Sequence, residues 1–378
     1  MKNNKRMSYA LAIAGALMIL IMGILLTGLV YKAVTGGFSK DKDKAALSGQ
    51  ITGQDSDGTE GQNGDLIEDE ALEPGKETYT RKEVAELLQE AREKAGKAGT
   101  EGILEDIKRV LSGGSMTMVE MLRPYYEDEI VVVSSGAFHF VPINEALKKN
   151  DYKSENLNIL ESGEIQYVED GQVTSHKGID VSKFQGEIDW EAVAADGVEF
   201  AFIRVGNRGY GAEGKLLEDD MFETNIEGAL QAGIKVGVYF YTQALNEEEV
   251  LAEAQLVLQK IAPYKVECPV VFDVEKVSGA NGRMNALSAK DRTDLTLLFC
   301  ETIKEAGYEP MIYYNMEMGT LMLELERLEE YEKWFAYYNP DLYYPYDYKI
   351  WQYSHSGKVN GIKGEVDMNI SFEPIWEE

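Results

Sequence analysis

Two acidic side chains, Asp273 and Glu275, stand one residue apart at the end of the apolar run Val270-Val271-Phe272. Alternate side chains of a strand share a face, so the two carboxyl groups are predicted to lie about 6.6 Å apart along it. Repulsion and burial raise the pKa of one of them, which leaves a proton donor beside an ionised neighbour. Such a pair suits glycosidic bond cleavage, in which one acid protonates the leaving oxygen and a second carboxylate stabilises the developing cation. The alternative is an ordinary surface pair where a strand enters its loop, and the surrounding elements decide between the two.

Apolar runs alternate with helical periodicity from residue 177 onward, which predicts a parallel sheet covered by helices. About eight strands over about 200 residues suit a small, irregular TIM-like (β/α) barrel, some of whose later connections lack full helices. The predicted strands are 178–181, 200–205, 235–242, 269–275, 310–315, 333–339, 349–354 and one near 366–367. The predicted helices are 190–195, 221–232, 247–261, 289–306 and 320–328.

Polar residues at the carboxyl ends of barrel strands are typical of functional sites. Asp180 ends the first predicted strand, Asp273 and Glu275 end the fourth, and Asp367 lies at the last. The first and last strands become neighbours when a barrel closes. Asp180 and Asp367 are therefore expected to face the pair on the fourth strand across the mouth of the barrel.

Residues 176–376 resemble the glycoside hydrolase family 25 muramidases. The matching motifs, in chain order, are Gly178-Ile179-Asp180-Val181-Ser182, Phe184-Gln185-Gly186, Phe200-Ala201-Phe202-Ile203-Arg204, Gly237-Val238-Tyr239-Phe240-Tyr241, Phe272-Asp273-Val274-Glu275, Trp351-Gln352-Tyr353-Ser354 and Gly364-Glu365-Val366-Asp367-Met368-Asn369. This resemblance implies an irregular (β/α) barrel. It also implies hydrolysis of the β-1,4 bond between N-acetylmuramic acid and N-acetylglucosamine in peptidoglycan.

The resemblance also implies roles for the four acids at the matching positions. Glu275 would be the general acid, and Asp273 would orient the acetamido group of the substrate or stabilise the cation. Asp180 and Asp367 would complete the acidic floor and tune the proton on Glu275. Retention and inversion of the anomeric centre both stay open, because the outcome depends on the separation of the carboxyl groups.

Three aromatic residues near the predicted strand ends, Tyr239, Tyr241 and Trp351, are candidates for stacking on sugar rings. Aromatic side chains are as common in a barrel core, which is the alternative for all three. Phe240 stands where family members often carry a histidine. That departure puts a substrate subsite in doubt rather than the proton donor.

We expect no cofactor and no metal, because His176 and His355 do not flank the acids at ligand spacing. The two cysteines, Cys268 and Cys300, are too few for a disulfide scaffold. They fit either a single bridge or two buried free thiols.

The amino-terminal segment predicts a membrane anchor. A basic end, residues 1–7, precedes an uncharged apolar run, residues 8–31, that is long enough to cross a bilayer. Cations before the run and acids after it predict that the amino end stays inside and the remaining chain lies outside the cell. An uncleaved single-pass signal anchor is favoured over a cleaved signal peptide, because no clean small-x-small site follows so long a run.

Between the anchor and the barrel, residues 32–77 are acidic and polar, which predicts a disordered linker that spans roughly 35 Å. Residues 78–175 predict a helical stalk followed by a small strand-rich module, together a small α+β module of unknown purpose. The net charge of −29 argues against a nucleic-acid partner.

These features together predict a membrane-anchored, extracytoplasmic muramidase whose partner is the glycan strand of peptidoglycan. One alternative is a non-catalytic glycan-binding barrel, although the presence of all four acids argues against a decayed site. Another is a chitinase-like hydrolase, which normally carries a longer acidic run before the catalytic glutamate than residues 269–272 offer. The sequence leaves the oligomeric state open.

Overall fold

The computed structural model describes residues 66–67, 79–80, 99–113, 117–277 and 282–376. The predicted anchor, residues 8–31, lies outside them, and no helix among the described residues is long and apolar enough to cross a membrane. The chain divides into two compact units, residues 1–96 and 97–378. In the first unit, β1 (Leu66–Ile67), which lies within the predicted linker, pairs antiparallel with β2 (Tyr79–Thr80).

The second unit contains the barrel, whose nine-stranded sheet has the order β10-β9-β11-β12-β13-β14-β15-β16-β8. A further pairing between β8 and β9 closes the sheet, and β10 is an antiparallel edge strand on β9. The strands are β8 (His176–Val181), β9 (Phe200–Arg208), β10 (Leu216–Glu218), β11 (Lys235–Tyr241), β12 (Val270–Asp273), β13 (Pro310–Asn315), β14 (Glu332–Ala336), β15 (Ile350–Gly357) and β16 (Val366–Ser371). The predicted (β/α) barrel is therefore confirmed. One correction concerns β16, which runs antiparallel to both of its neighbours.

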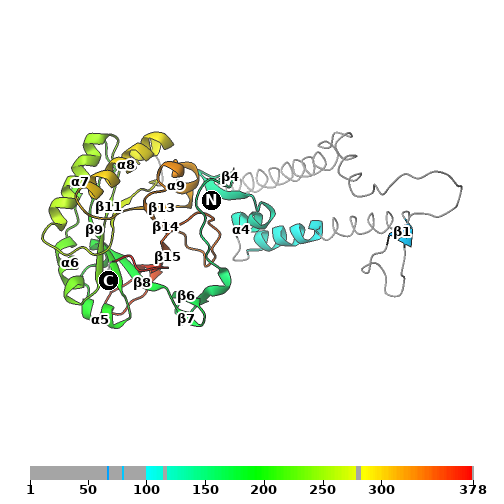
Figure 1. Ribbon diagram of the computed structural model, residues 1–378, viewed down its shortest axis with the longest axis horizontal. Helices are drawn as coiled ribbons and strands as arrows, with labels where there is room; N and C mark the ends of the chain where they lie inside the picture. The colour runs from blue at the N-terminus through cyan, green and yellow to red at the C-terminus, as the bar shows by residue number, and fades with distance from the viewer. Residues whose placement is uncertain (1–65, 68–78, 81–98, 114–116, 278–281, 377–378) are drawn as a thin grey trace, which may run out of the picture. The chain divides into compact units, whose positions relative to one another are not determined.

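Helices α5 to α8 cover one side of the barrel (Figure 1). They are α5 (Trp190–Ala195), α6 (Phe222–Gln231), α7 (Glu247–Ile261) and α8 (Ala289–Glu305). Polar side chains cap the amino ends of three of them, α5, α7 and α8: Asp189, Asn246 and Ser288 each accept a hydrogen bond from a backbone amide of the first turn.

The prediction of a helix over residues 320–328 is wrong. Asn315 caps an earlier helix, α9 (Met316–Leu321), and a separate 3₁₀ turn covers Leu325–Arg327. Contacts with α8 explain the break between them: Arg292 donates to the carbonyl of Met322 at 2.8 Å, and the Thr293 hydroxyl accepts from the amide of Glu324 at 2.9 Å. In a continuous helix, the carbonyl of Met322 and the amide of Glu324 would form hydrogen bonds within the helix. Here both are hydrogen-bonded to side chains of α8 instead.

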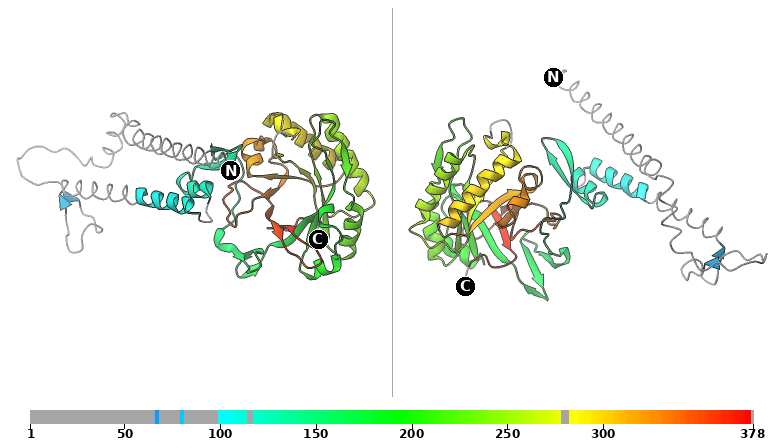
Figure 2. Two further views of the ribbon diagram at one scale, coloured as in Figure 1. Left: turned by 180° about the vertical axis from the view of Figure 1, so that it is seen from behind. Right: turned by 45° about the horizontal axis from the view of Figure 1, so that its top comes forward.

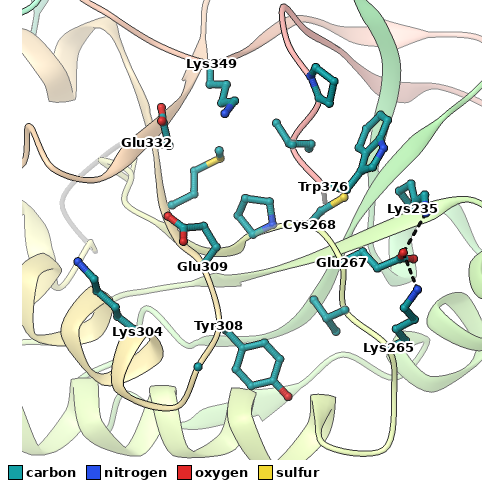
Figure 3. A pocket seen from close by; sticks show the side chains of 16 residues that line it. Lys235, Lys265, Glu267, Cys268, Lys304, Tyr308, Glu309, Glu332, Lys349 and Trp376 are labelled. Carbon is teal, nitrogen blue, oxygen red and sulfur yellow. Dashed lines mark hydrogen bonds and ion pairs between the residues drawn. The ribbon is translucent and has the colours of Figure 1, made fainter. Parts of the chain in front are cut away.

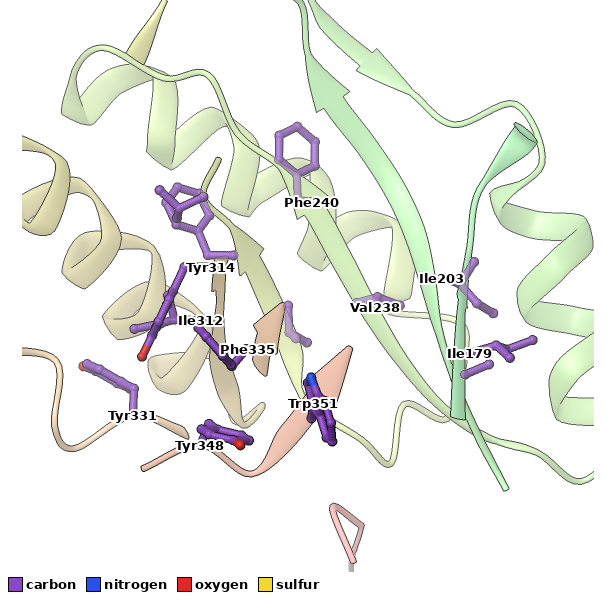
Figure 4. Close-up of a cluster of buried hydrophobic side chains, with 14 of the residues drawn as sticks. Ile179, Ile203, Val238, Phe240, Ile312, Tyr314, Tyr331, Phe335, Tyr348 and Trp351 are labelled. Atoms are coloured by element: carbon purple, nitrogen blue, oxygen red, sulfur yellow. The ribbon is translucent and has the colours of Figure 1, made fainter. Parts of the chain in front are cut away.

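Alternation along the strands separates the barrel interior from the layer beneath the helices. Phe202, Val271 and Trp334 point inward and form one buried cluster, and residues next to them point outward into a second. Figure 4 shows outward-pointing side chains that include Val238, Phe240 and Trp351. Gly178 leaves room inside for the ring of Phe200, because a Cβ added to it would lie 2.1 Å from that ring.

Cys268 and Cys300 are both buried free thiols, which settles the alternative that the sequence leaves open. Cys268 belongs to the inner cluster and Cys300 to the outer one, so they lie on opposite sides of the barrel wall. Burial raises the pKa of both thiols.

The segment that precedes the barrel lies on the side away from α6 and α7 (Figures 1 and 2). Residues 99–111 are helical, in the segment predicted as a stalk. In the segment predicted as a strand-rich module, the structure has a set of short elements. These are α4 (Met118–Leu122), β3 (Glu129–Ser134), β4 (Ala137–Pro142), β5 (Leu157–Ile159), β6 (Ile165–Glu169) and β7 (Gln172–Val173).

This module covers the connection from β14 to β15, residues 337–349, which contains no helix. Tyr152 stacks on Phe372 with ring centroids 3.6 Å apart and donates a hydrogen bond to the carbonyl of Tyr348 at 2.6 Å. The Asn150 amide donates to the carbonyls of Tyr344 and Tyr346. The module therefore shields a part of the barrel wall that a regular (β/α) unit would cover with a helix.

Candidate active site

The four predicted acids meet at the carboxyl end of the parallel strands. Asp180 on β8 pairs in register with Asp367 on β16. Asp273 is the last residue of β12, and Glu275 follows two residues beyond the strand, which is shorter than predicted. Because β16 is antiparallel, Asp367 reaches this end from the start of its strand and not from its carboxyl end.

Two neutral amides hold Asp180. Its Oδ2 accepts hydrogen bonds from Gln352 Nε2 at 2.8 Å and from Asn369 Nδ2 at 2.9 Å. Burial and the charge of Asp367 raise the pKa of Asp180, and the two amide bonds oppose this increase. The Asn369 oxygen in turn accepts from Trp334 Nε1 at 2.8 Å, which fixes the orientation of the amide.

A chain of hydrogen bonds joins Asp180 to Glu275. Gln352 Oε1 accepts from the hydroxyl groups of Tyr313 and Tyr338, each at 2.8 Å. Tyr313 also hydrogen-bonds to Glu275 and thereby lowers the pKa of that carboxyl group. The phenol carries one hydrogen, so Tyr313 can donate to only one of these partners at a time.

Burial makes proton donors of the carboxyl groups. It is the main cause that raises the pKa of Glu275, and the charge of Asp367 adds to it. Burial also raises the pKa of Asp367 to about 6, against the opposing charge of His355. Protons are therefore held at this end of the barrel at a pH where exposed carboxyl groups are ionised.

The surroundings of Asp273 differ from those of Asp180. It is buried, and its Oδ1 has no hydrogen-bond partner among the described residues. Burial and the charges of Glu275 and Asp180 raise its pKa, while Arg204 lowers it. Arg204 shares its own charge with Asp219, whose Oδ2 lies 2.6 Å from a guanidinium nitrogen.

The aromatic candidates fall into two groups. Tyr239 and Tyr241 point into the barrel. Burial, together with the charges of nearby acids, raises the pKa of both phenols. Trp351 is 1% exposed and lies in the outer core, with its Nε1 bonded to the carbonyl of Tyr337 at 2.7 Å. It therefore has no free face for a sugar ring, and the core alternative holds for this residue.

Phe240, which the resemblance marked as a departure, is also fully buried in the outer core. Its side chain points toward the helices and not into the barrel (Figure 4). A side chain at this position does not face the interior of the barrel, so the replacement of histidine by phenylalanine gives no reason to doubt a substrate subsite there.

Several residues of the site carry no predicted role: Arg204, Tyr313, Tyr338, Gln352 and Asn369. The signal that could have found some of them is parity, since Asn369 stands two residues after Asp367 and shares its face of the strand. The same alternation along a strand predicts that Gln352 points into the barrel if its neighbour Trp351 points outward. It does not identify which hydrogen bonds the amides form.

Phe184 is another residue without a predicted role. It follows β8 and is 78% exposed, and its ring centroid lies 5.0 Å from the guanidinium carbon of Arg204. An exposed aromatic face beside the acidic centre is a surface on which a sugar ring can stack.

A cavity of about 1040 Å³ lies at the other end of the barrel (Figure 3). Residues just before or at the starts of the parallel strands line it, including Lys235, Pro269 and Glu309. Lys235 and Lys265 both pair with Glu267 there. None of the four acids lines this cavity, which separates it from the site at the carboxyl end. In the described part of the chain, no group of three or more His, Cys, Asp or Glu residues is arranged to hold a metal ion.

The barrel matches a known protein family. The family model described as "Glycosyl hydrolases family 25" matches residues 179–362. The chain is similar to an uncharacterized protein of Escherichia coli strain K12, YegX, with 32% identity over 201 residues, 51% of this chain and 68% of that protein. It is also similar to the autolytic lysozyme of Clostridium acetobutylicum, with 28% identity over 202 residues, 53% of this chain and 56% of that protein.

Solved structures give further similarities. The modular autolysin LytC of Streptococcus pneumoniae has a TM-score of 0.49 and 24% identity, over 64% of this chain and 57% of that one. A family 25 glycosyl hydrolase of Bacillus anthracis has a TM-score of 0.45 and 24% identity, over 55% of this chain and 93% of that one. The chain thus spans little more than half the length of LytC and of the autolytic lysozyme.

The raised pKa of Asp367 predicts a pH-dependent effect on stability. A carboxyl group whose pKa rises to about 6 on folding favours the folded state while it is protonated, and this contribution is lost as the pH increases from about 4 to about 6. Asp367→Asn stays neutral, so the variant should be more stable than the wild type at pH 7, by up to about 3 kcal/mol, and about equal to it below pH 4.

Denaturant unfolding at both pH values measures this difference. The matched control is Asp151→Asn, at an exposed position outside the barrel, which should show no such pH dependence. A stability difference that is the same at both pH values would contradict the assignment.

Proposed function

The chain belongs to glycosyl hydrolase family 25, and from this premise we propose that it is an N-acetylmuramidase. Its substrate is peptidoglycan, in which it hydrolyses the β-1,4 bond between N-acetylmuramic acid and N-acetylglucosamine. The observation that carries the proposal is the Asp273 and Glu275 pair at the carboxyl end of the barrel, where partial or full burial raises the pKa of both carboxyl groups. The similarity to the autolytic lysozyme of Clostridium acetobutylicum supports this class of substrate.

In this proposal, Glu275 donates its proton to the glycosidic oxygen as the bond breaks. Its position next to the hydroxyl of Tyr313 supports the role, because the phenol can turn its hydrogen to the carboxylate that forms. The remaining sugar then carries developing positive charge, which nearby carboxylates stabilise.

Asp273 is proposed to hold the acetamido group of the substrate. Its buried Oδ1, without a partner in the described part of the chain, is placed to accept a hydrogen bond from an N–H group. Asp180 and Asp367 surround the pair and oppose ionisation of Glu275 and Asp273, which keeps a proton available. Tyr239, Tyr241 and the exposed ring of Phe184 are proposed to contact the sugar rings.

The membrane tether remains part of the proposal. The apolar run of residues 8–31 would anchor the chain, and residues 32–77 would hold the barrel off the surface on the outer side. A tether is useful here because the net charge of −29 gives no electrostatic attraction to an anionic wall.

Removal of the proton donor tests the chemistry. Glu275→Gln cannot protonate the leaving oxygen, so it should release new reducing ends from purified peptidoglycan about a thousandfold more slowly than the wild type, on the order expected for the loss of a general acid. Circular dichroism should match the wild type, and thermal unfolding should show no loss of stability, because the folded state raises the pKa of Glu275 as it does that of Asp367.

Glu187→Gln, an exposed neighbour in the loop after β8, is the matched control and should keep full activity. Full activity in Glu275→Gln would exclude the proposed acid. Binding of glycan by the wild type with no release of reducing ends would instead favour the non-catalytic barrel.

The Tyr313 contact predicts a shift in the pH–rate profile. A general acid works while protonated, so activity should fall as the pH rises through the pKa of Glu275. Tyr313→Phe removes the hydrogen bond that lowers this pKa, and the alkaline limb of kcat should therefore move to higher pH. An alkaline limb that stays in place or moves to lower pH would show that Tyr313 does not stabilise the Glu275 carboxylate.

The tether is tested by fractionation of bacterial cells that express the chain. The full chain should stay in the membrane pellet after alkaline extraction, and a chain that begins at residue 32 should not. Recovery of the full chain in the soluble fraction would disprove the anchor, whatever the outcome of the glycan assay.

A further inference from the structure

Lys276 directly follows the proposed acid, Glu275. Its ammonium group points out of the barrel and contacts the amino-terminal module. Nζ donates hydrogen bonds to the hydroxyl groups of Ser134 and Ser135, each at 3.1 Å. It also pairs with Glu317 Oε1 of α9 at 2.5 Å. Residues from two other parts of the chain, the β3–β4 turn and α9, therefore contact Lys276, which is adjacent to Glu275 in sequence.

The two serines lie at the tip of the β3–β4 hairpin, whose geometry fixes them. Ser135 and Gly136 have φ values of 51° and 80°, as the two central residues of a tight hairpin turn of type I′ require. Ser134 is the last residue of β3, and two residues on the same strand, Ile130 and Val132, are buried in the outer core of the barrel. The tip is therefore carried on a strand that is anchored to the barrel.

The base of the hairpin is also fastened to the barrel. Tyr343, in the connection between β14 and β15, accepts a hydrogen bond from the amide of Val131 at 2.7 Å and donates to the carbonyl of Glu129 at 3.2 Å. Arg123 lies over the ring of Tyr343, with its guanidinium carbon 3.8 Å from the ring centroid. These contacts restrict movement of the hairpin relative to the strand ends.

The barrel holds the residues on both sides of Lys276. Gln243 donates to the carbonyl of Glu275 at 3.4 Å, and Asn285 forms two hydrogen bonds with the backbone of Val277, at 3.1 and 2.8 Å. Lys276, between them, is held from the other direction by the hairpin and α9. The segment that carries the proposed acid is thus fixed from two sides.

We propose that the β3–β4 hairpin is a positioning element of the active site. Ser134 and Ser135, acting through Lys276, hold the backbone of Glu275 where its carboxyl group can protonate the leaving oxygen. Both serines precede residues 179–362, the part of the chain that the family model matches. The inference rests on the proposed function, because it assigns the hairpin to the reaction of Glu275.

The ammonium charge does not explain these contacts by itself. Glu317 already pairs with Lys276, with side chains 21% and 23% exposed, respectively, so the charge is balanced without the serines. The hydroxyl groups add direction and fix the side chain between two elements. A catalytic group displaced by about 1 Å can lose on the order of a hundredfold in rate, so a small movement of this segment is sufficient to affect kcat.

The test removes both hydroxyl groups from the full chain in detergent. Ser134→Ala combined with Ser135→Gly leaves Lys276 without its hairpin partners, and glycine accepts the positive φ at position 135. With soluble glycan fragments as substrate, kcat should fall by about tenfold or more while KM stays unchanged, since no proposed sugar contact is altered. Ser134→Thr keeps a hydroxyl group and should retain a kcat close to that of the wild type.

If the wild type is active and Glu275→Gln is inactive in the same assay, the proposed function stands, and two results would overturn this inference alone. One is an unchanged kcat in the double variant. The other is a loss of kcat that follows a lower melting temperature and that Ser134→Thr shows equally, because the hairpin would then act only on stability. An inactive wild type would overturn the proposed function and this inference with it.

Discussion

The constraint on which the structure depends is the burial of several carboxyl groups together at one end of a closed barrel. Asp180 is held by two neutral amides, from Gln352 and Asn369, and not by a cation. Arg204, which lowers the pKa of Asp273, shares its charge with Asp219. The acids therefore keep protons that exposed carboxyl groups would lose. Such a cluster is costly to bury, so rigid strands on all sides are needed to keep it in place.

Much of the barrel could be predicted from the sequence, because alternation and helical periodicity are local signals. The strand over residues 310–315 and the helix over residues 247–261 are found where the sequence places them. The direction of β16 could not be predicted, since it depends on pairing with strands distant in sequence. The break between α9 and the following turn depends on hydrogen bonds from α8, which are equally distant. Local patterns thus locate elements better than they locate their partners.

The same distinction separates the predicted site from the network that supports it. Asp180, Asp273, Glu275 and Asp367 stand out because acids at strand ends are unusual. Lys276 does not stand out, since its hydrogen bond to Ser134 joins residues 142 positions apart. The amino-terminal module looks like a separate domain in sequence, yet it covers a wall of the barrel that has no helix. Its contacts with the barrel give it a physical role beside the proposed acid.

The central claim is that the Asp273 and Glu275 pair cleaves a specific bond in peptidoglycan, and the chemistry of the products tests it most directly. Purified peptidoglycan would be digested with the chain from residue 78 onward, and the products reduced and identified by mass. The proposal predicts N-acetylmuramic acid at the new reducing ends, and none with Glu275→Gln. New reducing ends that carry N-acetylglucosamine, or glycan that is bound and left uncut, would contradict it.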